Sequence, residues 1–439
     1  MSSFHRRTVA ARTAATQERN TLTSAGFTPE AVDRVQAEKL IRLWDRLDGS
    51  PRYRELPHVT ARDFAAAPVT PKQEVKTEPF AFVRDDDILA RYYETSGSTG
   101  SPTPTPRAVE DGVWNTESVA TVWGRTLRPG DRVASLLPSD VAPVGDLVAS
   151  VAESLDCTFL RCYPFAQGMC DWDRLEELFA RFRPEHVFVA PGVLIQWTRM
   201  LKQRGRLDAV RESVRTALLL GEVSTAPMRV RLGDLWNCRV LDASYGSTET
   251  GTIGASCEHD RMHLLLPAHI AELRDEDGVV HPGVPGNTGE LVTTTLNNYA
   301  RPLLRYATGD IASVTPGDGC PCGLGLPVLT IHGRASDAVS VGGRPISAES
   351  VESVVYTVPE VTGYLIQLRS GEQPAARLVL ERDVDYTGPA EPVAERVRSR
   401  FAEAGVAWTS VVLVNQLPAV TKAGASQKNW KRTNVEWLS

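Results

Sequence analysis

Apolar and polar residues near the start of the chain recur with the spacing of a helix. In the stretch 30–47 the apolar positions fall on one side of a helical repeat, which predicts an amphipathic helix with one face turned to a core. These positions are Val32, Val35, Leu40, Leu43, Trp44 and Leu47. Residues 1 to about 90 are polar and helical in pattern as a whole, and the proline-rich stretch 51–83 is expected to be irregular.

Further along, short apolar runs alternate with helical patterns. The runs, which predict strands, lie at 132–137, 158–163, 186–190, 217–221 and 239–243. Helical patterns between them include 171–182 and 193–202. Strands that alternate with helices predict a parallel, doubly wound sheet that is covered on both faces. Ligands of such sheets bind beyond the carboxyl ends of the strands.

After Gly254 the pattern changes to short strands separated by turns. The strands are expected at 262–266, 270–274, 289–296 and 310–314, with turn signals at Asp277-Gly278 and Pro285-Gly286. This predicts a smaller β subdomain at about 255–332. From about Asp337 a mixed β/α pattern runs to the lysine-rich tail 422–432. The expected fold is therefore α/β, with a large domain at 1–336 and a small α+β domain at 337–439.

Composition narrows the class of protein. The chain has 439 residues, of which 42% are hydrophobic and 23% charged, and its formal net charge is -6. This acidic balance argues against nucleic acid as the main partner. No apolar run has the length of a membrane span, and no apolar segment follows Arg6, Arg7 and Arg12 as a secretory signal would require. With an odd count of 7 cysteines, we expect a reducing, cytoplasmic compartment.

A loop rich in small hydroxyl residues lies at 93–105, with the sequence Y-E-T-S-G-S-T-G-S-P-T-P-T. Glycine lets the backbone approach a ligand, and the hydroxyls add donors to those of the backbone. The loop suits nucleotide phosphates, although no lysine follows Gly100 as a Walker motif requires. Taken alone, it is equally typical of a solvated linker. The candidate phosphate-binding residues are Thr95, Ser96, Gly97, Ser98, Thr99 and Gly100.

Further motifs follow this loop in a specific order. They are 241–250 (L-D-A-S-Y-G-S-T-E-T), 305–311 (R-Y-A-T-G-D-I), 333–346 (G-R-A-S-D-A-V-S-V-G-G-R-P-I) and the lysine-rich tail. From about residue 90 onward, the chain resembles adenylate-forming enzymes of the acyl-CoA synthetase superfamily, and most closely the phenylacetate-CoA ligase branch. That branch also ends its phosphate loop in Pro-Thr, as Pro102-Thr103 does here. The resemblance implies the adenylate-forming enzyme fold, with a small mobile C-terminal domain.

The segment from Ser244 to Glu249 has a chemistry that suits a nucleotide. The aromatic face of Tyr245 can stack on a purine, and Gly246 allows close approach. The Thr248 hydroxyl can reach a phosphate oxygen, and the Glu249 carboxylate can hold Mg²⁺, which prefers hard oxygen ligands. The alternative is a strand end with an ordinary surface glutamate.

Other nucleotide contacts are implied by the resemblance. Asp310, expected at a strand start after Gly309, would accept both ribose hydroxyls. Arg334 would donate to ribose or phosphate oxygens, and a surface ion pair is its alternative role. Gly221 and Glu222, at the end of an apolar run, would flank the adenine.

The resemblance also implies a reaction in two steps. A carboxylate attacks the α-phosphate of ATP to give an acyl-adenylate and pyrophosphate, and a thiol then displaces AMP. The tail departs from the family pattern because Gly424 and Lys428 are not adjacent. Lys428 is expected to be the catalytic lysine, with Lys422 as the alternative, and a solvated basic tail is the third reading.

Two positions in the C-terminal region have roles that rest on the resemblance alone. Asp337 lies where the family has a hinge between its domains. Gly342-Gly343 would line the tunnel of the thiol acceptor, whereas the sequence by itself indicates a turn.

A cysteine pair suggests a metal site. Cys320 and Cys322 flank a proline, and Cys257 and His263 lie upstream. Some members of the branch carry a structural zinc at matching places, and four such ligands complete a tetrahedral site. His259 competes with His263, because the Cys-to-His spacing is one residue shorter than in the family. Ordinary buried or surface thiols are the alternative. The remaining cysteines, which we expect in the core, are Cys157, Cys162, Cys170 and Cys238.

The leading hypothesis is a ligase that uses ATP, Mg²⁺ and coenzyme A on a small aromatic acid. Few charged residues fall in 143–146, 191–197 and 222–224, where the acid is expected to bind, although these apolar residues also suit a core. A second hypothesis transfers the acyl group to a carrier-protein thiol, an amine or a hydroxyl. A third is a nucleotide-binding regulator without catalysis. The sequence does not give the oligomeric state, and a homodimer is left open.

Overall fold

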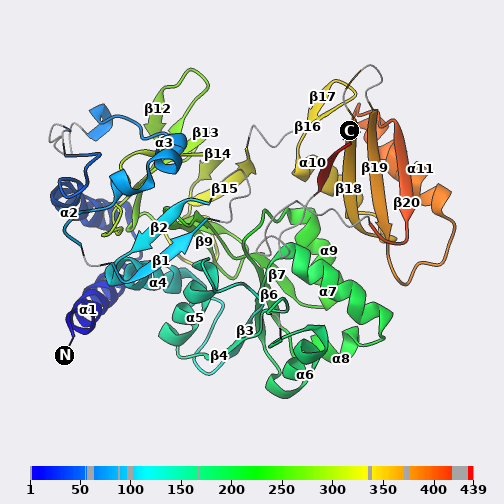
Figure 1. The fold of residues 1–439 in the computed structure, drawn as a ribbon, viewed down its shortest axis with the longest axis horizontal. Coiled ribbons are helices and arrows are strands. Elements are labelled where there is room, and N and C mark those ends of the chain that lie inside the picture. The colour runs from blue at the N-terminus through cyan, green and yellow to red at the C-terminus, as the bar shows by residue number, and fades with distance from the viewer. Residues whose placement is uncertain are drawn as a thin grey trace. The chain divides into compact units, whose positions relative to one another are not determined.

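The computed structural model describes residues 2–54, 56, 64–87, 89–95, 102–166, 168–334, 339–369, 371, 375–417 and 434–438. The chain divides into two compact units (Figure 1). The first comprises Met1–Asp131, Pro138–Phe159 and Ala243–Arg334. The second comprises Arg132–Leu137, Leu160–Asp242 and Ala335–Ser439. Within the described ranges, no helix combines the length and the apolar character needed to cross a membrane.

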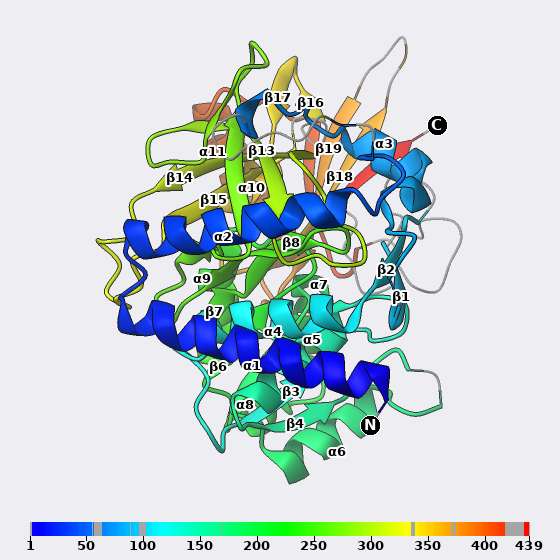
Figure 2. The ribbon, with the colours of Figure 1, turned by 90° about the vertical axis from the view of Figure 1, so that its left-hand side faces the viewer.

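The first unit begins with two long helices, as expected. Helix α1 spans Ser3–Ser24, and Ser2 caps it by accepting a hydrogen bond from the His5 amide at 3.2 Å. Helix α2 spans Pro29–Leu47, with the proline in its first turn. The apolar stripe of α2 is buried in a cluster that includes Leu40, Leu43, Leu47, Tyr53, Phe82, Leu303 and Tyr306. Helix α1 packs along α4 (Val109–Trp123), as Figure 2 shows.

An eight-stranded antiparallel sheet forms the core of this unit, in the order β12-β11-β13-β14-β15-β10-β9-β8. Its strands are β8 Ser244–Ser247, β9 Gly251–Ser256, β10 Met262–Leu264, β11 His269–Arg274, β12 Val280–Pro282, β13 Thr288–Thr295, β14 Tyr306–Thr315 and β15 Val328–Gly333. The short strands predicted after Gly254 are thus present, and the sheet to which they belong begins at Ser244. Alternate residues of these strands, among them Leu264, Leu273, Leu291, Val314 and Leu329, fill one core.

The expected position of Asp310 at a strand start was wrong. Strand β14 begins at Tyr306, so Asp310 lies inside it. Val292 pairs with Ala307 and Glu290 with Ile311, so three residues of β14 bulge out opposite Leu291. Gly309 supplies the left-handed conformation there, with φ of 79°. A bulge redirects the side chains that it carries, which explains how a residue within a long strand can serve a site.

Shorter elements complete the first unit. Strands β1 (Arg91–Glu94) and β2 (Pro104–Arg107) form an antiparallel pair on either side of the expected phosphate loop. Helix α3 spans Lys72–Thr77 and helix α5 spans Val144–Ser154, and short 3₁₀ turns lie at Phe64–Ala66 and Pro79–Phe82.

The second unit contains the parallel sheet that the alternating pattern predicts. The strand order is β4-β3-β5-β6-β7. The strands are β3 Arg132–Ser135, β4 Thr158–Arg161, β5 His186–Val189, β6 Thr216–Leu219 and β7 Arg239–Asp242, and the helices are α6 Trp172–Phe182, α7 Pro191–Gln203, α8 Leu207–Arg211 and α9 Ala226–Trp236. Trp197, which lies in a stretch considered for the acid pocket, instead packs against Phe179 and Trp236 with ring centroids at 4.7 and 5.2 Å. It is a core residue.

The C-terminal part of the second unit is α+β. A four-stranded sheet has the order β20-β19-β18-β21, and a separate hairpin precedes it. The elements are β16 Val339–Val341, β17 Arg344–Ile346, α10 Ala348–Val355, β18 Val361–Arg369, β19 Ala375–Arg382, α11 Ala390–Glu403, β20 Ser410–Val414 and β21 Val435–Leu438. The expected boundary between 336 and 337 falls outside the described residues, so the division into 1–336 and 337–439 stays a prediction.

Candidate functional site

A hydrogen-bonded group of three predicted site residues lies in the first unit. The Tyr245 hydroxyl donates to Asp310 Oδ2 at 2.7 Å, and Arg334 Nε donates to Asp310 Oδ1 at 2.8 Å. Burial raises the pKa of the Tyr245 hydroxyl, and the adjacent Asp310 carboxylate raises it further. Asp310 in the bulge of β14 thus meets Tyr245 of β8, which is 65 positions away in sequence, and Arg334 after β15, which is 24 positions away. The Asp310 carboxylate keeps lone pairs for a ligand that carries hydroxyls.

Glu249 is buried, which contradicts the alternative of an ordinary surface glutamate. The residue is only 4% exposed. Its backbone carbonyl accepts hydrogen bonds from Arg107 and from Asn298, both at 3.3 Å. No group in the described ranges donates a hydrogen bond to its carboxylate. A buried carboxylate without a donor suits a divalent cation, so the residue fits the expected magnesium ligand.

The turn that carries Thr248 and Glu249 is held by its own hydroxyls. The Ser247 amide donates to Thr250 Oγ1, and the Thr250 amide donates to Ser247 Oγ, each at 3.2 Å. Arg107 also donates to the Thr248 carbonyl at 2.6 Å. The backbone of the motif is therefore fixed before any ligand binds.

Two buried arginines that the sequence reasoning missed support this region. Arg301 is fully buried, and it donates to the Pro104 carbonyl at 2.7 Å and to Thr105 Oγ1 at 2.9 Å. Burial lowers the pKa of Arg301 to about 10, the nearby charge of Arg107 lowers it too, and that of Glu249 raises it. Neither arginine lies in a motif used for the prediction.

The phosphate loop is described only at its two ends. The Thr95 amide donates to the Thr103 carbonyl at 3.2 Å, and the Thr103 amide donates to Thr95 Oγ1 at 2.9 Å. Thr95 therefore closes the base of the loop. The other predicted residues of the loop, which lie outside the described ranges, are Ser96, Gly97, Ser98, Thr99 and Gly100.

Gly246 has a structural reason to be glycine, beside the predicted approach of a ligand, which stays a prediction. Ser244, Tyr245 and Gly246 form β8, and a Cβ atom at Gly246 would lie 2.2 Å from the Gly251 carbonyl oxygen in β9. The contact between the two strands therefore requires a glycine at this position.

The predicted adenine-flanking residues lie in the second unit. Gly221 and Glu222 follow the carboxyl end of β6, where ligands of parallel sheets bind. Gly221 has φ of 89°, which glycine adopts readily. Gly342 and Gly343 form the turn between β16 and β17, with φ of 58° and 81°, so the turn is confirmed.

Three predicted residues cannot be assigned a position. Lys428, its alternative Lys422 and the expected hinge residue Asp337 all lie outside the described residues.

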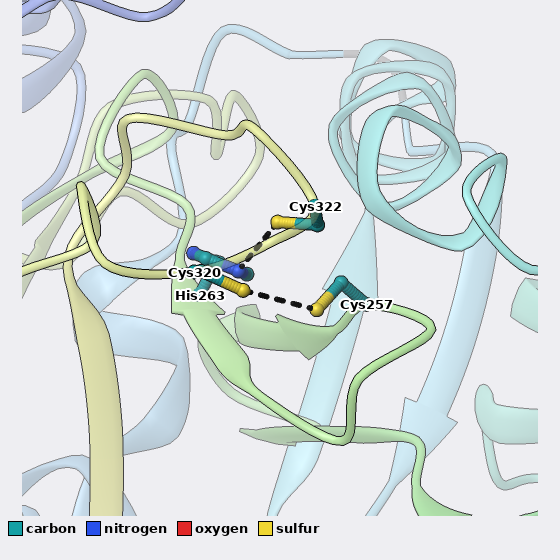
Figure 3. A group of neighbouring side chains, drawn as sticks. All are labelled: Cys257, His263, Cys320 and Cys322. Carbon is teal, nitrogen blue, oxygen red and sulfur yellow. Dashed lines mark hydrogen bonds between the residues drawn. The ribbon is translucent and has the colours of Figure 1, made fainter.

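Four predicted metal ligands form one buried cluster (Figure 3). The ligand atoms of Cys257, His263, Cys320 and Cys322 all lie within 4.8 Å of one another. Cys257 Sγ is 3.7 Å from Cys320 Sγ, and Cys322 Sγ is 3.3 Å from His263 Nε2. Burial raises the pKa of Cys322 to about 12 and lowers that of His263. Such a set of soft ligands without an open position suits a structural zinc ion.

The surroundings of His263 distinguish it from His259. His263 Nδ1 lies 2.7 Å from the Leu326 carbonyl, to which it can donate its proton, and this leaves Nε2 as the metal ligand. The His259 side chain is 43% exposed and lies near Glu258. His263 is therefore the histidine that joins the cluster, although the spacing from Cys257 differs from that of the family.

Comparison with known proteins shows the family to which the chain belongs. The AMP-binding enzyme family matches residues 6–299. The phenylacetate-coenzyme A ligase of Thermus thermophilus is 28% identical over 329 residues, which cover 73% of this chain and 72% of that protein. The phenylacetate-coenzyme A ligase of Aromatoleum evansii is 26% identical over 316 residues, which cover 70% of this chain and 69% of that protein.

Solved structures share the fold. A crystal structure of 2-hydroxyisobutyryl-CoA ligase in complex with 2-HIB-AMP superimposes with a TM-score of 0.76 at 18% identity. The match covers 94% of this chain and 90% of the other. This confirms the adenylate-forming fold that the sequence predicts.

Proposed function

Because the chain belongs to the AMP-binding enzyme family and is similar to its phenylacetate-CoA ligases, we propose that it activates a carboxylic acid with ATP and transfers the acyl group to coenzyme A. The observation that carries the proposal is the buried Glu249 carboxylate, which has no donor among the described residues. Burial raises the pKa of the Tyr306 hydroxyl, and the charges of Glu249 and Asp310 raise it too, which supports placing the two carboxylates in one site.

In this proposal each residue has a defined task in binding ATP. Asp310 accepts hydrogen bonds from the ribose hydroxyls, and its bonds to Tyr245 and Arg334 keep it oriented. Glu249 is the ligand of Mg²⁺, which when bound neutralises phosphate charge. The Thr248 hydroxyl and the phosphate loop donate to phosphate oxygens.

The chemistry then consists of two displacements. An oxygen of the acid attacks the α-phosphorus, the bond to pyrophosphate breaks, and an acyl-adenylate forms. The sulfur of coenzyme A next attacks the acyl carbon, and AMP leaves as the thioester forms. Negative charge builds on the phosphate oxygens in the first step, so a cation is needed there, and Lys428 is its proposed source.

An aromatic acid is the proposed substrate class. The names of the relatives support it, since both are phenylacetate-coenzyme A ligases. The acceptor is proposed to be coenzyme A for the same reason. A carrier-protein thiol, an amine or a hydroxyl remains the alternative acceptor, because the tail around Lys428 departs from the family pattern.

We also propose that Cys257, His263, Cys320 and Cys322 hold a structural zinc ion. When bound, the ion would link the β9–β10 segment to the loop before β15 and would stabilise this part of the sheet.

The test is acid-dependent exchange of pyrophosphate into ATP across benzoates, hydroxy- and aminobenzoates, phenylacetates and fatty acids. We expect exchange with one aryl class, and thioester formation when coenzyme A is added. Exchange without thioester would favour another acceptor. Absence of exchange with every acid, in protein that binds ATP, would contradict the proposed function.

A further inference from the structure

A lysine outside all of the motifs lies at the bulge that carries Asp310. Lys72 is the first residue of α3, far upstream of the motif in sequence. Its ammonium group donates to the Thr308 carbonyl at 2.9 Å. Thr308 and Asp310 belong to the same three-residue bulge of β14, and the Asp310 amide donates to Thr308 Oγ1 at 3.2 Å. The N-terminal region therefore contributes a cation to the candidate site.

The backbone around Lys72 is fixed on β14. The Thr70 amide donates to the Arg305 carbonyl at 2.9 Å, and the Ala307 amide donates to the Thr70 carbonyl at 3.0 Å. Thr70 Oγ1 also donates to the Leu304 carbonyl at 2.7 Å. Since these bonds come directly before Lys72, its side chain starts from a rigid position, unlike an ordinary surface lysine.

The charge of Lys72 has no directly bonded counter-ion among the residues that the structure describes. The side chain is half-buried, and no carboxylate of the described part of the chain bonds to its ammonium group. Burial lowers the pKa of Lys72, Arg334 lowers it further, and Glu249 and Asp310 raise it. A partly buried cation whose bonded acceptor is a neutral carbonyl is incompletely compensated, so an anionic ligand would stabilise it.

We propose that Lys72 binds the α-phosphate of the nucleotide, an inference that rests on the proposed function. In that function Asp310 holds the ribose and Glu249 holds the metal ion on the outer phosphates. The α-phosphate joins these two parts of ATP, and Lys72 lies within the influence of both carboxylates. A compact ammonium charge suits a phosphate oxygen, and it would oppose the charge that develops during attack on phosphorus.

The test measures by calorimetry how two nucleotides, ATP and AMP, and the nucleoside adenosine bind to the Lys72→Met variant. Methionine keeps the length of the side chain and removes its charge. We expect the dissociation constants of ATP and AMP to rise roughly 10- to 100-fold, as for loss of a hydrogen bond between charged groups, and that of adenosine to stay the same. Lys76→Met, one turn further along α3, is the matched control and should bind all three like the wild type.

Each other outcome overturns the inference. Equal weakening for adenosine would indicate a structural role for Lys72, and weakening for ATP alone would assign it to the outer phosphates. Unchanged binding would remove it from the site. Lys72→Gln serves if the methionine variant does not fold. Failure of the proposed function and failure of the inference about Lys72 are distinguished by pyrophosphate exchange in the wild type. Absence of exchange would contradict the proposed function, whereas the nucleotide-binding measurements would still test the role of Lys72.

Discussion

Two buried glutamates show that the role of a residue depends on what its neighbours offer. Glu272 accepts hydrogen bonds from Arg305 at 2.9 and 3.0 Å, and Arg305 also binds the Ala65 carbonyl at 2.7 Å. The hydrogen bonds of this ion pair are made within the protein. Arg305 is therefore a structural residue, although it lies in one of the motifs. Glu249 is buried to a similar degree and receives no such donors from the described residues. Of these two carboxylates, only that of Glu249 has no hydrogen-bond donor within the described ranges, which suits the predicted cation.

At the residue scale, Glu249→Gln tests this distinction. The amide cannot replace the carboxylate as a ligand of Mg²⁺, so we expect acid-dependent pyrophosphate exchange to fall by roughly 100-fold or more, the loss typical of a missing electrostatic contact. The melting temperature should change little, because the carboxylate makes no bond within the described protein. Glu272→Gln is the control and should lower the melting temperature instead. Full exchange activity in Glu249→Gln would remove Glu249 from the site.

At the scale of elements, the antiparallel sheet depends on side chains that join its strands. His269 at the start of β11 is buried, and its Nε2 lies 2.8 Å from the Thr252 carbonyl in β9. The cysteine cluster similarly joins the segment around β10 to the loop before β15. Both features connect segments that are not adjacent in sequence. We expect the contact of His269 to respond to pH and the cysteine cluster to respond to removal of a metal ion.

His269 predicts a loss of stability in acid. Burial lowers the pKa of His269 from 6.5 to about 4, so between these values the unfolded chain binds a proton that the folded chain does not. The free energy of unfolding should therefore fall as pH decreases from 6.5 to 4, by up to about 3 kcal/mol for this group. His269→Asn should lose this part of the pH dependence in urea titrations. His281→Asn, at an exposed position on β12, should retain it, and identical profiles for all three proteins would contradict the prediction.

The cysteine cluster predicts a bound zinc ion that supports the sheet. We expect about one zinc per chain by elemental analysis, and a lower melting temperature after removal by a strong chelator. Cys322→Ser should lose the metal and show the lower melting temperature without chelator. Cys238→Ser, which changes a thiol outside the cluster, should keep both properties. A protein that binds no zinc and is indifferent to chelation would leave the cluster as ordinary buried thiols.

At the scale of the whole molecule, distant parts of the second unit are joined by one aspartate. Asp383 lies just after β19, and Lys202 at the end of α7 donates to its two oxygens at 2.7 and 2.9 Å. Arg231 on α9 donates to the same carboxylate at 3.1 Å. The Asp383 side chain is only 5% exposed, so two cations and one anion form a buried group that links segments more than 150 positions apart.

Asp383→Asn is expected to destabilise this unit by about 3 kcal/mol, because it leaves two poorly exposed cations without their shared carboxylate. Asp385 provides the matched control. It also pairs with Lys202, at 2.7 Å, but its side chain is 71% exposed. Asp385→Asn should cost less than about 1 kcal/mol, as for a surface ion pair. Equal effects in urea unfolding would show that burial does not decide the strength of this link.

The sequence by itself predicted the fold class, contained the motifs in their order and indicated the candidate site residues. Alternation of apolar runs with helical patterns predicted the parallel sheet, because burial on both faces of a strand leaves a continuous apolar run. The motifs of the sequence also indicated Asp310, Arg334, Tyr245 and Glu249, since the chemistry of these residues suits a nucleotide and the motifs follow one another in a specific order.

Only the tertiary structure decided how these residues act together. The bulge at Asp310, the choice of His263 over His259 and the strand contact that requires Gly246 depend on which strands pair and in which register. Lys72, Arg107 and Arg301 carry no local signal, because their roles come from segments that folding brings together. Pairing between distant strands is set by the packing of the whole sheet, which a local pattern of residues does not contain.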